Sequence, residues 1–273
     1  MGLRHDRALM PTSTALRLTG RDVLTVLHRI GTNALEDLAV GQARATLFCD
    51  FRGRMLHRTL VVPVADGSVW LLRDDAPGEA LAAFIDRFVF REDLHIEDLS
   101  ADWAVSRHLE TSAAFVEERD GRPLRFASGD GTAYLVGTGG PFDERARIAH
   151  GIPRHGHEIV EDFTPFEVGL AHEVHLDKGC FTGQEALMRL VTYDSVRRQL
   201  ARVTLSAENT PALPSDITKA GARVGRLTSA AGRDALAVLR KDALEGAADL
   251  ALADGTRVEV AHAFEPTRPL GRP

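Results

Sequence analysis

The sequence predicts an α+β fold in which antiparallel sheet dominates and a small β-barrel ends the chain. Asp-Gly pairs at 66–67, 120–121 and 254–255 each separate two strand-like apolar runs, as tight hairpin turns do. Other stretches carry apolar residues at helical spacing. Strands joined in hairpins, with helices packed separately, indicate an α+β fold and not a doubly wound parallel sheet.

Each Asp-Gly pair is expected to form a type I′ turn. Such a turn needs positive φ at both central residues, and Asp followed by Gly adopts that conformation readily. Asp130-Gly131 is expected to be a fourth turn, before the apolar run 133–136.

Three helices are expected among these strands. Thr19 is placed to cap a helix that carries Val23, Leu24, Leu27 and Ile30, with Gly31 at its end. A second helix is expected over 75–88, and a third after Thr182, where Ala186, Leu187, Leu190 and Val191 form an apolar stripe.

A domain boundary is expected near residues 196–202. It divides the chain into a first region, 1–195, and a C-terminal domain, 196–273. Five short strand-like runs in that second part indicate a small barrel: 201–205, 222–228, 236–239, 250–252 and 258–261. A loop is expected at 209–214, and the residues after Phe264 are expected to be a frayed tail.

The composition favours a cytoplasmic protein that binds neither a membrane nor nucleic acid directly. The chain has 273 residues and a net charge of −6, without an obvious basic patch for a nucleic-acid backbone. Two cysteines, Cys49 and Cys180, fit a reducing compartment. Residues 1–11 lack the apolar core of a secretory signal, and no run approaches the roughly 20 apolar residues of a membrane span.

Residues 178–185, here called the cysteine segment, carry the strongest chemical signal. Thr182 followed three residues later by Glu185 predicts a capping box, which places Cys180 near the positive end of a helix. Lys178 stands two residues before Cys180, and Gly179 leaves the backbone open. These conditions favour a thiolate over a thiol. The alternative is that Cys180 is a small buried apolar residue in a tight turn.

The cysteine segment reads Lys-Gly-Cys-Phe-Thr-Gly-Gln-Glu. It resembles the signature of the YgfZ-type folate-binding proteins, which are related to the glycine cleavage T-protein. The resemblance extends to 18–22, 50–54, 147–153, 164–167, 224–229 and 235–237. It implies two ferredoxin-like antiparallel-sheet subdomains and a small C-terminal β-barrel around a central pocket.

The resemblance also implies a function. YgfZ-type proteins are folate-dependent accessory factors for the assembly or maintenance of iron–sulfur proteins, including enzymes that modify tRNA. Their partners are folate and iron–sulfur assembly factors or enzymes. By this likeness Cys180 and Lys178 are the catalytic candidates. The rest of the segment supports them: Gly179, Phe181, Thr182, Gly183, Gln184 and Glu185. Tetrahydrofolate is the implied cofactor, with Glu167, Arg147 and His57 as candidate binding residues.

Two departures from true T-proteins bear on the activity. Those enzymes carry an aspartate a few residues beyond the first hairpin, whereas residues 53–59 contain no carboxylate and place His57 and Arg58 there. A cationic or neutral side chain cannot stabilise a developing iminium, so conventional aminomethyl transfer is not expected. Ala149 also stands where relatives have a glutamate suited to a pterin, and Glu167 or Glu158 could take over that role.

Two other functions therefore stay open. One is a folate-dependent one-carbon transferase of the T-protein type, and the other is a scaffold that has lost folate binding.

No metal site is expected. Five histidines, at 150, 155, 157, 172 and 175, do not specify ligands that converge on one point, so surface positions are expected for them. Cys49 lies in an apolar run and is expected in the core. Gly137-Thr138-Gly139-Gly140 is too short for a phosphate loop and is expected to be a turn.

Overall fold

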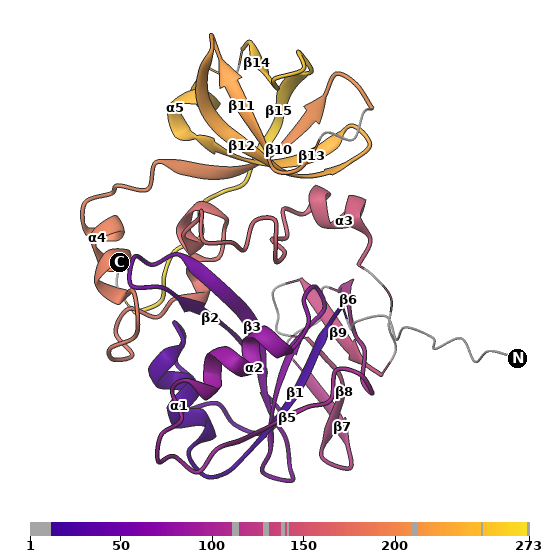
Figure 1. Ribbon diagram of the computed structural model, residues 1–273, viewed down its shortest axis with the longest axis vertical. Coiled ribbons are helices and arrows are strands. Elements are labelled where there is room, and N and C mark those ends of the chain that lie inside the picture. Colours follow the sequence, from indigo (N-terminus) through magenta and orange to yellow (C-terminus); the bar gives the residue numbers. More distant parts are fainter. Residues whose placement is uncertain are drawn as a thin grey trace, which may run out of the picture. The chain divides into compact units, whose positions relative to one another are not determined.

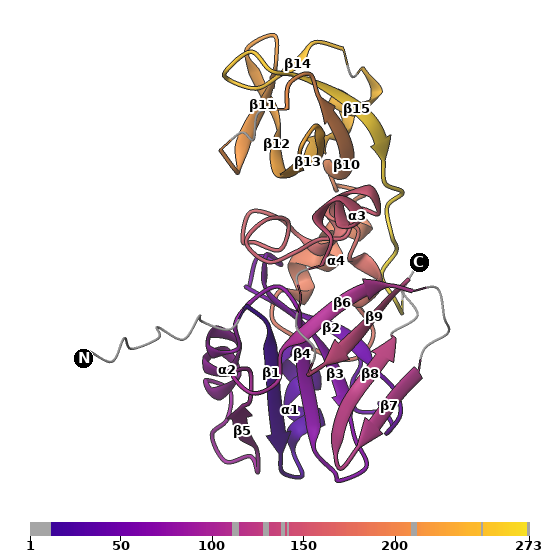
Figure 2. The same ribbon diagram turned by 90° about the vertical axis from the view of Figure 1, so that its right-hand side faces the viewer.

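The computed structural model of the chain describes residues 12–110, 115–127, 131–137, 140, 142–208, 212–246 and 248–271. The α+β class and the C-terminal barrel are confirmed (Figures 1 and 2). The chain forms two compact units. The first comprises 1–26, 38–44 and 60–141, and the second comprises 27–37, 45–59 and 142–273.

The first sheet has the strand order β2-β3-β4-β1-β5. Its strands are β1 (Thr14–Thr19), β2 (Arg44–Cys49), β3 (Met55–Pro63), β4 (Val69–Arg73) and β5 (His95–Asp98). In the first unit β1 pairs antiparallel with β4 and β5, and β4 pairs with the end of β3. Every residue of β4 is buried, and this burial explains why residues 69–72 of the strand are all apolar.

Two helices follow strands of this sheet. Helix α1 (Val23–Ile30) follows β1, and helix α2 (Glu79–Asp86) follows β4. Leu81, Phe84 and Ile85 are the buried residues of α2, as its apolar spacing predicts.

The second sheet lies entirely in the first unit and is antiparallel, in the order β6-β9-β8-β7 (Figure 2). Its strands are β6 (Val105–Leu109), β7 (Phe115–Arg119), β8 (Arg122–Ala127) and β9 (Thr132–Val136). Phe126 and Tyr134 stack with ring centroids 5.1 Å apart, one of the cross-strand aromatic pairs that fix register in a sheet.

The barrel lies in the second unit and is closed by six strands in the order β10-β13-β12-β11-β14-β15 (Figure 1). They are β10 (Arg198–Leu205), β11 (Ser215–Lys219), β12 (Ala222–Ala231), β13 (Asp234–Arg240), β14 (Leu250–Ala251) and β15 (Arg257–Ala263). Alternate residues of β13 face two different cores. Ala235, Ala237 and Leu239 fill the barrel, whereas Leu236 and Val238 join the neighbouring apolar cluster of the same unit.

Irregular chain and short helices make up residues 142–197 of the second unit. They include α3 (Glu144–Ala149), α4 (Gln184–Thr192), the 3-10 turns η1 (Pro165–Glu167) and η2 (Ala171–Glu173); a short helix, α5 (Lys241–Glu245), follows β13. Three phenylalanines at 163, 166 and 181 are buried in this unit's apolar cluster. Burial of these rings holds a segment that has little regular hydrogen bonding of its own.

The expected hairpins form, but their turns differ. At Asp120-Gly121 both residues have positive φ, as a type I′ turn requires. In the other two pairs only Gly67 and Gly255 do, so these turns are not type I′. The sequence analysis missed strand β11 and the turn at Ala220-Gly221, where both residues have positive φ. The barrel therefore has six strands and not five.

One helix cap, the length of one helix and the C-terminal tail were predicted wrongly. Thr19 ends strand β1 and does not cap α1, which begins at Val23. Helix α2 is shorter than the expected 75–88. The tail after Phe264 is not frayed: the Ala171 N–H donates to the Thr267 hydroxyl at 2.9 Å, and Leu270 exchanges backbone hydrogen bonds with Val174 and Leu176.

Some expected features lie wholly or partly outside the described residues. They are Asp130 of the fourth turn, residues 138–139 of the glycine-rich turn and residues 209–211 of the barrel loop. The N-terminal residues 1–11, residue 114 before the 120–121 hairpin turn, and residues 272–273 of the tail also lie outside.

Candidate functional site

Cys180 is exposed in the loop between η2 and helix α4, so its thiol is available to a partner. Cys49, the other cysteine, is buried in the core as expected. Burial, followed by the nearby Asp50 carboxylate, raises the pKa of the Cys49 thiol well above its usual range. Of the two thiols, only Cys180 is placed for chemistry.

Lys178 and His28 tie the cysteine segment to helix α1 within the second unit. The His28 Nδ1 accepts the Leu35 N–H at 3.0 Å, so its Nε2 carries the hydrogen and donates to the Lys178 carbonyl at 3.0 Å. In return the Lys178 Nζ donates to the His28 carbonyl. Sequence reasoning missed His28, because its partner lies 150 residues away and no local pattern marks it.

Phe181 and Gln184 anchor the other side of the segment. The Phe181 ring is buried in the apolar cluster of the second unit. The Lys178 Nζ lies 5.1 Å from the centroid of that ring, within the range of a cation–π interaction. The Gln184 side chain donates to the Leu176 carbonyl at 2.8 Å. Cys180 is therefore exposed, whereas the residues on both sides of it in the loop are held by burial and hydrogen bonds.

Gly183 caps helix α4, in place of the capping box expected from Thr182 and Glu185. Gly183 occupies the N-cap position with φ 86°, and Thr182 is exposed. Glu185 pairs instead with Arg189 on the helix surface at 2.5 Å. Cys180 thus lies three residues before the N-cap, farther from the helix than expected. The field of a helix dipole falls off within about one turn of the helix end. The electrostatic effect of α4 at Cys180 is therefore weaker than the sequence suggested.

Gly183 also packs against the turn between β2 and β3. A Cβ at this position would lie 2.4 Å from the Asp50 carbonyl oxygen and 3.0 Å from the Gly53 Cα. That turn is itself held by the Asp50 carboxylate, which accepts the backbone N–H groups of Arg52 and Arg54 at 2.8 Å each. The cysteine segment and this hairpin therefore form one close-packed structure.

Partial burial lowers the pKa of Lys178 to about 8, against the smaller opposing effects of Glu36 and Cys180. Near neutral pH the Lys178 ammonium is charged, and it becomes a neutral amine at mildly alkaline pH.

Labelling of Lys178 by an amine reagent is expected to rise with a midpoint near pH 8. Only the neutral amine reacts, and at pH 8 about half of Lys178 is neutral, compared with less than roughly 1 in 100 for an ordinary lysine. Reductive methylation followed by peptide mass spectrometry measures this. Lys219 and Lys241, the only other lysines, are internal references in the same sample. A Lys178 midpoint above pH 10 would contradict the expectation.

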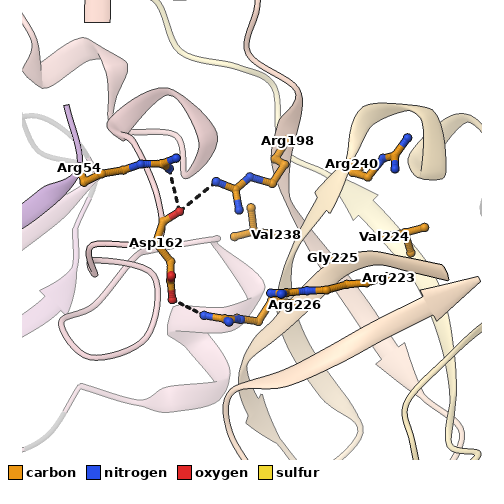
Figure 3. Close-up of a pocket in the computed structure, with 9 residues that line it drawn as sticks. All are labelled: Arg54, Asp162, Arg198, Arg223, Val224, Gly225, Arg226, Val238 and Arg240. Carbon is orange, nitrogen blue, oxygen red and sulfur yellow. Dashed lines mark hydrogen bonds and ion pairs between the residues drawn. The ribbon is translucent and has the colours of Figure 1, made fainter. Parts of the chain in front are cut away.

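Glu167 lies in an arginine-rich network of the second unit, and Figure 3 shows the part of this network around Asp162. Its Oε1 accepts from Arg198 at 2.6 Å, and its Oε2 accepts from the Thr164 N–H at 2.9 Å and lies 3.4 Å from Arg54. Arg54 and Arg198 both donate to the Asp162 carbonyl, and Arg226 pairs with the Asp162 carboxylate. Both oxygens of Glu167 already have partners.

Arg147 belongs to a second network, built around the fully buried Glu158. Arg147 donates to Glu144 at 2.6 Å and to Glu158 at 3.1 Å. The other Glu158 oxygen accepts from the hydroxyls of Thr228, at 2.5 Å, and Ser229, at 2.7 Å. This network fastens the segment after α3 to barrel strand β12.

The three residues expected to hold folate are therefore not grouped by any hydrogen bond or ion pair among them in the described part of the chain. Glu167 and Arg147 belong to separate networks, and His57 is half-buried on β3. A pterin would have to displace arginine or hydroxyl partners from Glu167 or Glu158. These carboxylates do not present a vacant pterin-binding face, and their role in folate binding stays a prediction.

The described residues contain no group of three or more His, Cys, Asp or Glu side chains placed to hold a metal ion. Three of the histidines expected at the surface, His155, His157 and His175, are instead half-buried and bonded. The His155 Nε2 accepts the Arg58 N–H at 3.0 Å, and the His157 Nδ1 lies 2.7 Å from the Thr228 carbonyl.

The structure also reveals a buried ion pair that no local sequence pattern predicts. Arg58 donates two hydrogen bonds to Glu173, at 2.6 Å from Nη2 to Oε1 and at 2.9 Å from Nε to Oε2. Both side chains are nearly inaccessible. The Glu173 carbonyl also accepts from the Thr32 hydroxyl at 2.8 Å. The pair connects strand β3 to η2, just before the cysteine segment.

None of the described helices has the length and apolar character needed to cross a bilayer.

Comparison with known proteins gives three findings. Residues 197–264 match the C-terminal beta-barrel domain of CAF17. The chain is 42% identical over 89 residues to the chloroplastic Arabidopsis thaliana protein At1g60990, whose name describes it as a transferase. It is 36% identical over 97 residues to an aminomethyltransferase of Moorella thermoacetica. These matches cover 33% and 36% of this chain, but only 20% and 26% of the two relatives, well short of their full lengths.

A solved structure resembles nearly the whole chain. It is the glycine cleavage system aminomethyltransferase T of Bartonella henselae, with a TM-score of 0.72 over 92% of this chain and 83% of that chain, at 14% identity. At this identity the likeness establishes the fold. The chain therefore has the fold of an aminomethyltransferase T, and its barrel is similar to the C-terminal beta-barrel domain of CAF17.

Proposed function

We propose that this chain is a YgfZ-type accessory factor for iron–sulfur proteins, including enzymes that modify tRNA, and that Cys180 is its working group. The observation that carries the proposal is an exposed thiol on a loop whose flanking residues are fixed at both sides. The CAF17-type barrel, which is related to iron–sulfur assembly, adds support from a separate part of the chain.

In this proposal Cys180 acts as a thiolate toward a cluster, iron or a thiol of the partner protein. Lys178 stabilises that thiolate by its positive charge near neutral pH. Gly179 keeps the backbone beside it unobstructed, since a Cβ there would meet nothing within 4 Å. Phe181, Gly183 and Gln184 hold the loop, while Thr182 and Glu185 lie on its surface.

The proposal keeps three further expectations: tetrahydrofolate is a ligand, the protein is located in the cytoplasm, and a domain boundary lies at residues 195–196. Folate is suggested by the aminomethyltransferase fold and relatives. No reaction step of the proposal passes through folate, because the candidate residues Glu167 and Arg147 already have internal partners.

Complementation tests the function. A bacterium that lacks its own YgfZ-type protein is supplied with this chain, and the activity of an iron–sulfur tRNA-modifying enzyme is measured. The proposal expects that activity to be restored. If the chain is expressed and folded and the activity stays at the level of the deletion strain, the proposed function is wrong.

The fold and relatives also support a second candidate, a folate-dependent one-carbon transferase. Residues 53–59, which form the end of the β2–β3 turn and the start of β3, contain no carboxylate to stabilise an iminium. Purified protein given tetrahydrofolate and an aminomethyl donor is therefore expected to form no methylenetetrahydrofolate. Catalytic formation of that product would favour the transferase.

A further inference from the structure

A cavity of about 350 Å³ lies in the second unit, where the barrel meets the turn before β3 (Figure 3). Its lining is dominated by guanidinium groups. Five arginines contribute to it: Arg54, Arg198, Arg223, Arg226 and Arg240. Asp162 is the one acidic residue that lines it within the described chain, and Val224 and Val238 supply apolar surface.

The charges around this arginine cavity do not balance. Glu167 pairs with two of the arginines, Arg54 and Arg198. Three aspartates pair with the others: Asp162 with Arg226, Asp216 with Arg223, and Asp242 with Arg240. Four carboxylates thus face five guanidinium groups, and only Asp162 among those carboxylates lies in the cavity lining. The lining itself carries four positive charges in excess.

Several of these ion pairs can be exchanged at little cost. The side chains of Arg223 and Arg240 are 52% and 53% exposed, and their aspartate partners are more than half exposed. Such solvent-exposed pairs contribute little to stability. The Arg223–Asp216 ion pair is made through Nε at 3.0 Å, which leaves the two terminal nitrogens of Arg223 without a hydrogen bond to described residues.

We propose that the arginine cavity binds a small polyanion, a molecule with two or more phosphate or carboxylate groups. Guanidinium forks match the oxygens of both groups and form paired, charge-assisted hydrogen bonds with them. A volume of about 350 Å³ is at the lower end of the range for small-molecule sites. An extended nucleic acid suits the chain less, because the net charge of the chain is −6. The proposal does not depend on Cys180.

Calorimetric titration of the full chain at low ionic strength tests the site, with tripolyphosphate and triglutamate as probes. One equivalent of at least one probe is expected to bind. The double variant Arg223→Gln/Arg240→Gln should lower that affinity at least about tenfold, because each change removes a charge-assisted contact. Both residues are exposed, so the fold should persist, and circular dichroism checks that it does.

The matched control is Arg202→Gln/Arg257→Gln, which removes two charges from the same barrel outside the cavity lining. It should bind the probe as the wild type does. Tripolyphosphate binding alone identifies a phosphate ligand, and triglutamate binding alone identifies a carboxylate ligand. The proposal is overturned if neither probe binds, if both double variants lose affinity equally, or if only a single-stranded RNA oligonucleotide binds.

Discussion

The variant Gly183→Ala is expected to lower the stability of the protein by about 3 kcal/mol. Two costs add up. An L-residue at the left-handed φ of 86° costs roughly 1–2 kcal/mol. The new Cβ would also meet the Asp50 carbonyl oxygen at 2.4 Å, and overpacking of this kind costs about 1–3 kcal/mol. The obstacle is backbone on both sides, so no side-chain rotation relieves it.

Thermal unfolding followed by circular dichroism measures the effect, with an expected fall in Tm of roughly 6–12 °C. Gly179→Ala is the matched control in the same segment. Gly179 also has positive φ, 113°, but a Cβ there would meet nothing within 4 Å, so only the backbone cost applies. Equal losses in the two variants would show that the close packing against the β2–β3 turn does not contribute.

The variant Glu173→Gln is expected to lower the free energy of unfolding by about 3–5 kcal/mol, the usual result of removing one partner from a buried ion pair. Arg58 is 7% exposed and Glu173 2% exposed, so water cannot replace the lost carboxylate charge. The change keeps the shape of the side chain, removes its charge and replaces one of its two acceptor oxygens with an NH2 donor. Urea denaturation measures the difference.

A double-mutant cycle with Arg58→Met isolates the ion pair from other effects. Once Arg58 is gone, Glu173→Gln should cost much less, which gives a coupling energy of about 2 kcal/mol or more. Glu185→Gln breaks the exposed pair with Arg189 and should cost less than about 0.5 kcal/mol. Additive effects of Arg58→Met and Glu173→Gln would mean that the pair is not coupled in solution.

The sequence predicted those features that depend on neighbours along the chain. Asp-Gly pairs marked three hairpins, apolar spacing marked the helices, and a series of short strands marked the barrel. Strand β11 was missed because its sequence, Ser-Asp-Ile-Thr-Lys, contains a single apolar residue. It pairs with β12 and β14, and only the closed barrel fixes it there.

The sequence located the cysteine segment along the chain but did not predict its three-dimensional contacts. Thr182 and Glu185 have the spacing of a capping box, yet Gly183 begins the helix because it alone can lie against the Asp50 turn. Lys178 bonds to His28, and Glu167 bonds to Arg198; both partners lie far from these residues along the chain. Local pattern cannot reveal such pairs, because the fold and not the sequence spacing brings them together.

The central claim, that the exposed thiol of Cys180 is the working group, is tested most directly by comparing two variants in the complementation assay. Cys180→Ser removes the exposed thiol, and Cys49→Ala removes the buried one. The account predicts that Cys49→Ala restores the activity of the iron–sulfur tRNA-modifying enzyme as the wild type does, whereas Cys180→Ser, expressed and folded, does not. Full restoration by Cys180→Ser would contradict the account and leave Cys180 without a chemical role.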